Sequence, residues 1–224
     1  MSLLGTVALM FLASAVVMPL LAWAYASRAL APCRIKDDPG RKVVGPRRWF
    51  RVVGNGLFSA VVVVTMCILG ERWLVHGGSD GWLVGTWHTV AILLLYDFLY
   101  YFLHRFAFHQ WPPLKRVHTV HHMVRHPNAP DALFLHPVEN ALGLILLFAC
   151  IAALGPVSLV CFGVIITAHS IINIVVHCGL DVPMLGMRLI GFLARKHDLH
   201  HTSMRGGNFA SITPFWDRLF GTAE

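Results

Sequence analysis

Histidine is the residue type with the clearest chemical pattern, because eight of the 14 histidines fall into three short groups. On a helix, residues i, i+3 and i+4 project from one face, so we expect each His-x-x-His-His to direct three ring nitrogens at one point. Imidazole is a common metal ligand, and a tetrahedral zinc ion needs only four ligands. The supply of imidazoles therefore predicts two metal ions. The groups are His104-x4-His109, His118-Thr-Val-His121-His122 and His197-Asp-Leu-His200-His201.

The spacing of the first group does not fit a regular helix. His104 and His109 are five residues apart, which places them about 140° apart around an ideal helix. Either the helix ends or bulges between them, or they serve different metals. The spacing also leaves the metal open, because imidazole suits zinc, copper, iron and nickel.

The composition predicts that these histidines belong to a membrane protein. Hydrophobic residues make up 56% of the 224 residues and charged residues only 13%, and the mean hydropathy is +0.64. A typical soluble domain has about 25% charged residues. We expect an all-α integral membrane protein with about four transmembrane helices, which could form two hairpins. The long apolar stretches are Ser2–Ala26, Val52–Gly70, Gly81–Leu103 and Asn140–Leu180, the last long enough for two crossings with a turn at Gly155-Pro156.

The first apolar stretch has a second interpretation. Ala22-Trp23-Ala24 resembles a signal-peptide cleavage site. The stretch is long and no basic region precedes it, so we favour a retained span.

The basic residues predict the orientation in the membrane. Although the net charge is +7, eight of the 18 basic residues lie between Arg28 and Arg51, in a loop between two apolar stretches. This distribution is typical of a cytoplasmic loop that touches anionic lipid headgroups, and it argues against nucleic-acid binding. The following hairpins then return all three histidine groups to the cytoplasmic face. We expect a helical cap there, including the polar and irregular segment Gln110–Pro137, that holds the dimetal site.

The order His-x4-His, His-x-x-His-His, His-x-x-His-His in a multi-span protein resembles the fatty acid hydroxylase/sterol desaturase superfamily. Flanking motifs strengthen the resemblance: Asp97 to Arg105, His136-Pro137-Val-Glu139, and Asn208 followed by Trp216 to Thr222. It covers residues 92–222, the expected catalytic region. Residues 1–91 supply the N-terminal spans and the basic loop of what we expect to be one membrane domain, residues 1–224.

The resemblance implies a di-iron centre that uses O2 to oxidise a lipid C–H bond, giving an alcohol or an alkene. It also implies a further ligand from the helix before the last histidine group, for which His177 is the candidate. Asn173, one turn earlier, could ligate through water. By position the ligands would be His104, His109, His118, His121, His122, His177, His197, His200 and His201, with Asn173.

Three residues are candidates for orienting a ligand: Asp97, His136 and Asp198. An ionisable group within a span is costly, so Asp97 could accept a ring N–H of a ligand histidine, or it could make a hydrogen bond between helices. Asp217 could act similarly or could cap the last turn. His169 is expected to be a core or substrate-channel residue, and His126 to lie on the surface.

The sequence has no dinucleotide-binding glycine motif and no cysteine cluster for iron–sulfur. A separate electron donor is therefore implied, a ferredoxin or a cytochrome b5-like protein with its reductase. Lys115, Arg116 and Arg125, beside the central histidine group, could dock such a partner. The small size suggests a bacterial inner-membrane protein.

Three alternatives remain at this stage. A carotenoid-type hydroxylase would use the same chemistry. A membrane metal transporter or sensor would need ligands along a pathway through the spans. A zinc hydrolase would need a general-base carboxylate in a motif such as His-Glu-x-x-His, which this sequence lacks.

Overall fold

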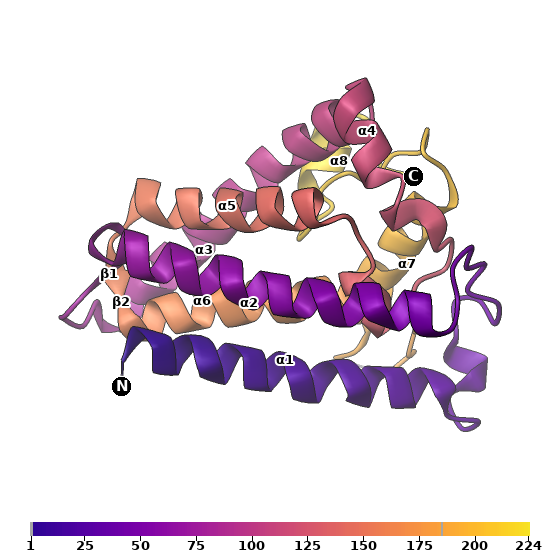
Figure 1. The fold of residues 1–224 in the computed structure, drawn as a ribbon, viewed down its shortest axis with the longest axis horizontal. Coiled ribbons are helices and arrows are strands. Elements are labelled where there is room, and N and C mark those ends of the chain that lie inside the picture. The colour runs from indigo at the N-terminus through magenta and orange to yellow at the C-terminus, as the bar shows by residue number, and fades with distance from the viewer. Residues whose placement is uncertain (1, 185) are drawn as a thin grey trace.

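The computed structural model describes residues 2–184 and 186–224, which form a bundle of long helices with one loop-rich end (Figure 1). Five helices of the described chain are long and apolar enough to cross a membrane. The prediction of a helical multi-span protein is confirmed, with five candidate spans against the expected four or so. The spans are α1 (Leu3–Ala26), α2 (Pro46–Leu74), α3 (Gly81–Phe102) continued by a π-helical segment (Leu103–Phe108), α5 (Pro137–Leu154) and α6 (Leu159–Val176).

Helix starts follow the local sequence. The side chains of Ser2 and Ser158 accept backbone N–H groups at the starts of α1 and α6, as N-cap residues do. Pro46 opens α2 and Pro137 opens α5, where a missing N–H costs nothing. The helix α2 therefore starts six residues before the expected Val52, and the last arginines of the basic loop belong to its first turns.

One of those arginines fixes α2 to the following loops. Arg48 is 6% exposed, and its Nε donates to Asp131 Oδ1 at 2.8 Å. Arg41, in the preceding loop, donates to the other oxygen of Asp131 at 2.7 Å. Asp131 lies in a short 3-10 helix, Ala129–Leu133, so the buried Arg48 and the half-buried Arg41 tie the basic loop to the segment after the central histidines.

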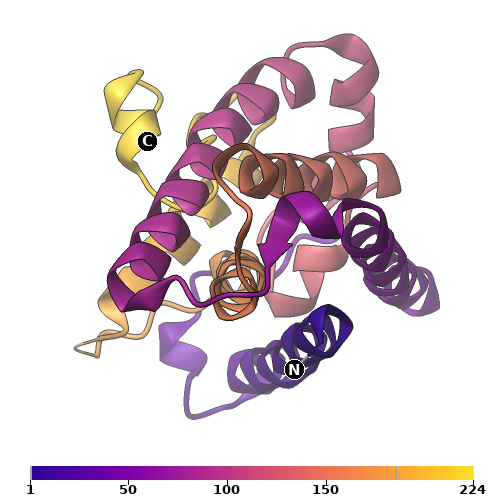
Figure 2. The same ribbon diagram turned by 90° about the vertical axis from the view of Figure 1, so that its left-hand side faces the viewer.

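The end of the bundle away from the histidines is closed by a small parallel pairing of β1 (Val75–His76) with β2 (Val157–Ser158). These strands lie in the two turns that connect α2 to α3 and α5 to α6, and Figure 2 faces this end. Fully buried apolar residues such as Ile92, Phe162 and Ile165 fill the interior between the helices.

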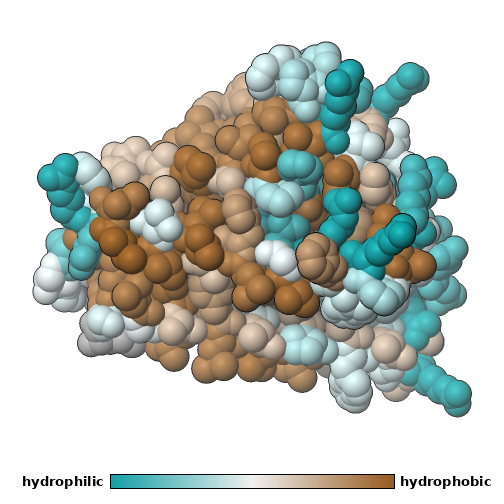
Figure 3. All heavy atoms as spheres, viewed as in Figure 1, coloured by the Kyte–Doolittle hydropathy of each residue, from teal (hydrophilic) through white to brown (hydrophobic). Residues whose placement is uncertain are grey.

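The histidine groups lie at the opposite end, which is built from α4, α7, α8 and the loops around them (Figure 1). Figure 3 shows hydrophilic side chains at this end and a broad hydrophobic surface over the long helices, as expected for lipid-facing residues. The segment Gln110–Pro137 is irregular, as predicted. The short elements here are α4 (Pro112–His118), 3-10 helices at Ala31–Cys33, His121–Met123 and Ala129–Leu133, α7 (Arg188–Thr202) and α8 (Phe215–Leu219).

Candidate metal centre

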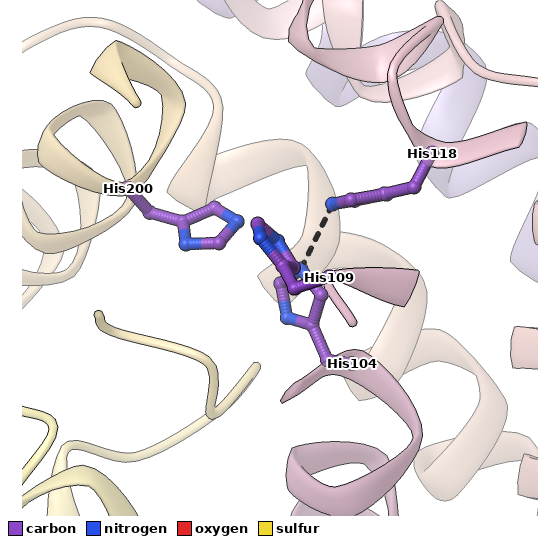
Figure 4. A group of neighbouring side chains, drawn as sticks. All are labelled: His104, His109, His118 and His200. Carbon is purple, nitrogen blue, oxygen red and sulfur yellow. Dashed lines mark hydrogen bonds between the residues drawn. The ribbon is translucent and has the colours of Figure 1, made fainter. Parts of the chain in front are cut away.

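Eight buried or half-buried histidines gather into two groups of four, and within each group the ring nitrogens lie within 4.8 Å of one another. Figure 4 shows the first group, in which the four rings converge from the end of α3, from α4 and from α7. Each group offers the four imidazoles that one metal ion would take. The first group is His104, His109, His118 and His200, and the second is His121, His177, His197 and His201.

The expectation that each His-x-x-His-His directs its three nitrogens at one point is wrong. The helix α4 ends at His118, and His121 starts a separate 3-10 helix after a turn, so the two rings reach different groups. On α7, His197 and His201 lie four residues apart and enter the second group, while His200 faces the first. Each metal position would therefore draw ligands from both triads.

A π-helical segment explains how His104 and His109 reach the same group. The backbone N–H of His109 donates to the carbonyl of His104 at 3.1 Å, an i to i+5 bond. In a π-helix residues five apart lie on nearly the same face, and such segments are frequent at functional sites. Of the two possibilities left by the sequence, the bulge is the one observed.

Two further candidates take distinct positions. His122 lies between the groups, with its Nε2 3.0 Å from His118 Nε2 and its ring stacked at 4.9 Å on His201. Asn173 lies four residues before His177 on α6, where its backbone carbonyl accepts the His177 Nδ1–H at 2.7 Å and its side chain lines the cavity described below.

The rings are held by hydrogen bonds from their Nδ1 atoms. A carbonyl oxygen can only accept, so each of these Nδ1 atoms carries the proton and the Nε2 atom is left with a free lone pair. Such an anchor on the far nitrogen is the usual arrangement for a metal-binding histidine. The acceptors are the carbonyls of Phe209 for His104, Met204 for His109, Phe134 for His121, Asn173 for His177, Gly207 for His200 and Val124 for His201.

The Nε2 atoms meet one another in a way that fits a cation. His121 and His177 both carry the Nδ1 proton, yet their Nε2 atoms lie 3.1 Å apart. Two lone pairs at this distance repel unless a positive ion lies between them. The buried Nε2 atoms of His109 and His200 have no hydrogen-bond partner among the described residues. The residues present therefore fit metal ions at both groups.

Burial keeps the imidazoles neutral, which is the form that binds metals. It lowers the pKa of His109 to about 4 and the pKa of His177 to about 3. It also lowers the pKa of His200 and His201 well below the ordinary histidine value. At pH 7 each of these rings is therefore neutral, with a proton on Nδ1 and a free lone pair on Nε2.

The three residues expected to orient ligands do other work. Asp97 accepts from the backbone N–H groups of Ile212 and Thr213 at 2.7 and 3.0 Å, so it holds the C-terminal segment and not a histidine or a neighbouring helix. His136 accepts the N–H of Val138 and caps α5. Asp198 accepts from Nδ1 of His126. His126 is half-buried, so the expectation that it lies on the surface is wrong.

The role of Glu139 was missed from the sequence, although its motif was noted. Glu139 is 4% exposed and accepts the Nδ1–H of His118 at 2.8 Å. A lone glutamate at the start of an apolar helix is costly, and that was the available signal. Asp217, one of the candidates named from the sequence, acts with Lys196 to hold the loop that supplies the Gly207 and Phe209 carbonyls.

Replacing Glu139 with alanine should weaken metal binding at the first group by about 10–100-fold, the usual effect of removing a residue that anchors a ligand. Glu139→Gln keeps an acceptor oxygen for His118 and should retain most of the metal. Val138→Ala, at the exposed neighbouring position, is the matched control. Metal content after dialysis against a graded chelator measures the effect. Equal retention by Glu139→Ala and Val138→Ala would contradict the anchoring role.

A cavity of about 480 Å³ extends from both histidine groups into the bundle, between α1, α2, α3, α5 and α6. It reaches His104 and His118 of the first group and His121, His177 and His197 of the second. The remaining walls are mostly apolar. Its lining includes Ala15 of α1 and Leu57 of α2, which are exposed, so the cavity extends to the lipid-facing surface between these helices.

Comparison with known proteins gives a consistent result. The family model described as fatty acid hydroxylase matches residues 89–222. The chain is 34% identical over 148 residues to methylsterol monooxygenase 1 of Rattus norvegicus, covering 63% of this chain and 48% of that protein. It is 32% identical over 153 residues to a cholesterol 25-hydroxylase-like protein of Danio rerio, covering 64% and 58%.

A very-long-chain aldehyde decarbonylase of Oryza sativa subsp. indica is 27% identical over 150 residues, covering 62% of this chain and 55% of that protein. The chain spans about half the length of the curated relatives it matches. No solved structure matches the chain.

Proposed function

The chain belongs to the fatty acid hydroxylase family, and we propose that it is a membrane-bound di-iron oxidase that uses O2 to hydroxylate or desaturate a lipid. The relatives are named for a methylsterol, for cholesterol and for very-long-chain aldehydes. The substrate proposed for this chain is a sterol, a fatty acyl chain or a related lipid.

The observation that carries the proposal is the position of two four-histidine groups at the end of an apolar cavity. In a hydroxylation one oxygen atom of O2 enters the C–H bond and the other leaves as water, with two electrons and two protons supplied from outside. Iron ions held by the histidines would supply the activation of O2 for this reaction. The proposed ligands are His104, His109, His118 and His200 for one ion, His121, His177, His197 and His201 for the other, with His122 between them and Asn173 through water.

The protein's own residues bind, orient and shield. The backbone carbonyls and Glu139 fix the ring orientations before any ion binds, so little order is lost on binding. The apolar walls bind the hydrocarbon part of the substrate and exclude water from the reacting carbon. Tyr100, whose ring is 5.3 Å from that of His104, lies where the cavity meets the first group.

The electrons would come from a separate acidic donor, a ferredoxin or cytochrome b5-like protein. Lys115 and Arg116 lie on α4, the helix that ends at His118, and Arg125 follows the 3-10 helix with His121 and His122. The basic side chains therefore lie close to both groups, which suits docking of an acidic protein. With the positive-inside rule, this face is the cytoplasmic one.

The alternative of a metal transporter is less favoured by the geometry. A transport pathway needs ligands at intervals through the membrane. In residues 2–184 and 186–224, both metal-type groups lie at one end of the bundle, and the cavity beyond them is mainly apolar.

The test is to purify the protein from iron-replete cells, count the metals, and measure O2 uptake with a chemical reductant and a total membrane lipid extract. We expect about two irons per chain and oxidised lipid in proportion to O2 consumed. His76→Ala, in the turn at the far end, is the control and should keep full activity.

Zinc that entered during overexpression is a known complication, so a second sample is stripped and reloaded anaerobically with ferrous iron. If the reloaded protein binds iron but consumes no O2 with any lipid fraction, the proposed function is wrong.

A further inference from the structure

The cavity contains a polar patch deep between the helices, formed by Ser14 of α1, Tyr96 of α3, and His169 and Ser170 of α6. The hydroxyl oxygens of Ser14 and Ser170 lie 2.8 Å apart. The ring of His169 meets that of Tyr96 edge-on, with centroids 4.6 Å apart. In a cavity whose other walls are mainly apolar, this is a concentrated set of hydrogen-bonding groups.

Two members of the polar patch have unused hydrogen-bonding capacity. Tyr96 is 3% exposed and lines the cavity, and its hydroxyl makes no hydrogen bond to the described residues. His169 lines the cavity beside it, and its ring nitrogens likewise have no partner within the described chain. Tyr96 is buried and His169 half-buried, and both line the cavity, so an oxygen atom of a ligand in the cavity would supply the partner that these groups lack within the described chain.

The distance from the polar patch to the histidine groups follows from α6. His169, Asn173 and His177 are spaced four residues apart, all three line the cavity, and they therefore form one stripe along the helix. Eight residues of helix rise about 12 Å. A ligand that touches both His169 and the second histidine group must therefore span about this length.

Taking the proposed function as given, we propose that the lipid substrate carries a hydroxyl or carbonyl oxygen that binds the polar patch, about 12 Å from the carbon that is oxidised. Tyr96 donates to this oxygen, and His169 and the serine pair either donate or accept. A plain hydrocarbon in the same place would leave these groups unpaired. A site built to hydrogen-bond a substrate oxygen discriminates strongly against the analogue that lacks it.

Binding of a matched pair of probes, hexadecanol and hexadecane, tests the proposal without depending on turnover. Each is titrated into the purified, metal-loaded protein in detergent, and the apparent Kd is taken from the shift in unfolding midpoint. We expect the alcohol to bind about tenfold more tightly than the alkane, the effect of one or two hydrogen bonds. Equal affinity for the two probes would overturn the proposal.

Variants assign the difference to the polar patch. Tyr96→Phe and His169→Leu should each reduce the preference for the alcohol by about three- to tenfold, and His169→Gln should restore most of it. Ile166→Leu, in the apolar wall on the same helix, should keep the preference. If Tyr96→Phe and His169→Leu keep it too, the oxygen binds elsewhere and the proposal is wrong. If the wild-type protein prefers the alcohol but oxidises no lipid, the proposed function is wrong, while the proposal that the polar patch binds an oxygen atom still holds.

Discussion

Replacing His118 and His121 together with alanine should remove nearly all bound iron, whereas replacing His118 and His200 together should remove about half of it. His118 and His121 are three residues apart but reach different groups, and His118 and His200 are 82 positions apart in one group. If each group binds one ion, the first pair of substitutions damages both sites and the second pair only one. Lipid oxidation should be abolished in both variants, because the proposed reaction uses both ions.

The measurement is iron per chain by elemental analysis after removal of loosely bound metal, together with product formation. The same experiment separates two models of the site. If each His-x-x-His-His held one ion, the His118/His121 variant would keep half of the iron and the His118/His200 variant would lose nearly all. Thr119→Ala, at the exposed position between His118 and His121 and outside both groups, is the control for general damage and should keep both ions.

The sequence was sufficient to identify the histidines but not how they are divided between the groups. The spacing pattern identified seven of the eight members of the two groups, and the family resemblance identified the eighth, His177. The division depends on backbone details that residue spacing does not reveal, namely the end of α4 at His118 and the π-helical segment between His104 and His109. In a regular helix, His104 and His109 would point in different directions, and His118 and His121 would share one face.

The spans were predicted closely because hydrophobicity determines them. The stretch Gly81–Leu103 agrees with α3 to within a residue, and Gly155 and Pro156 separate α5 from α6. The supporting contacts could not be predicted, since they join residues far apart in the chain. Asp97 contacts Ile212, 115 positions away, and a sequence gives no direct sign of such a pairing.

Replacing Asp217 with alanine should destabilise the protein by about 3–5 kcal/mol and selectively weaken the first metal position. The Asp217 carboxylate is fully buried and accepts from Phe209 N at 2.7 Å and Ala210 N at 3.1 Å. It also pairs with Lys196 Nζ at 3.0 Å, so the substitution leaves a buried ammonium group without its counter-charge. That uncompensated charge is the main source of the expected loss.

The first metal position is weakened selectively because of the carbonyl groups that this loop supplies. The carbonyls of Gly207 and Phe209 anchor His200 and His104, both in the first group, whereas the carbonyls that anchor His121 and His201 come from Phe134 and Val124. Loosening the loop should therefore lower metal affinity about 10–100-fold at the first position, with little change at the second.

Chelator titration would then show two classes of iron in Asp217→Ala, one of them released early. Arg218→Ala, at the exposed neighbouring position, is the control and should behave as wild type.

A double variant, Lys196→Met with Asp217→Leu, separates the loss of stability from the loss of metal affinity. It removes both buried charges and so should recover much of the stability, because replacing a buried ion pair with apolar residues is often neutral. It does not restore the acceptor for the loop N–H groups, so the first metal position should stay weak. Recovery of stability and metal together would mean that the charge alone, and not the loop geometry, holds His104 and His200 in place.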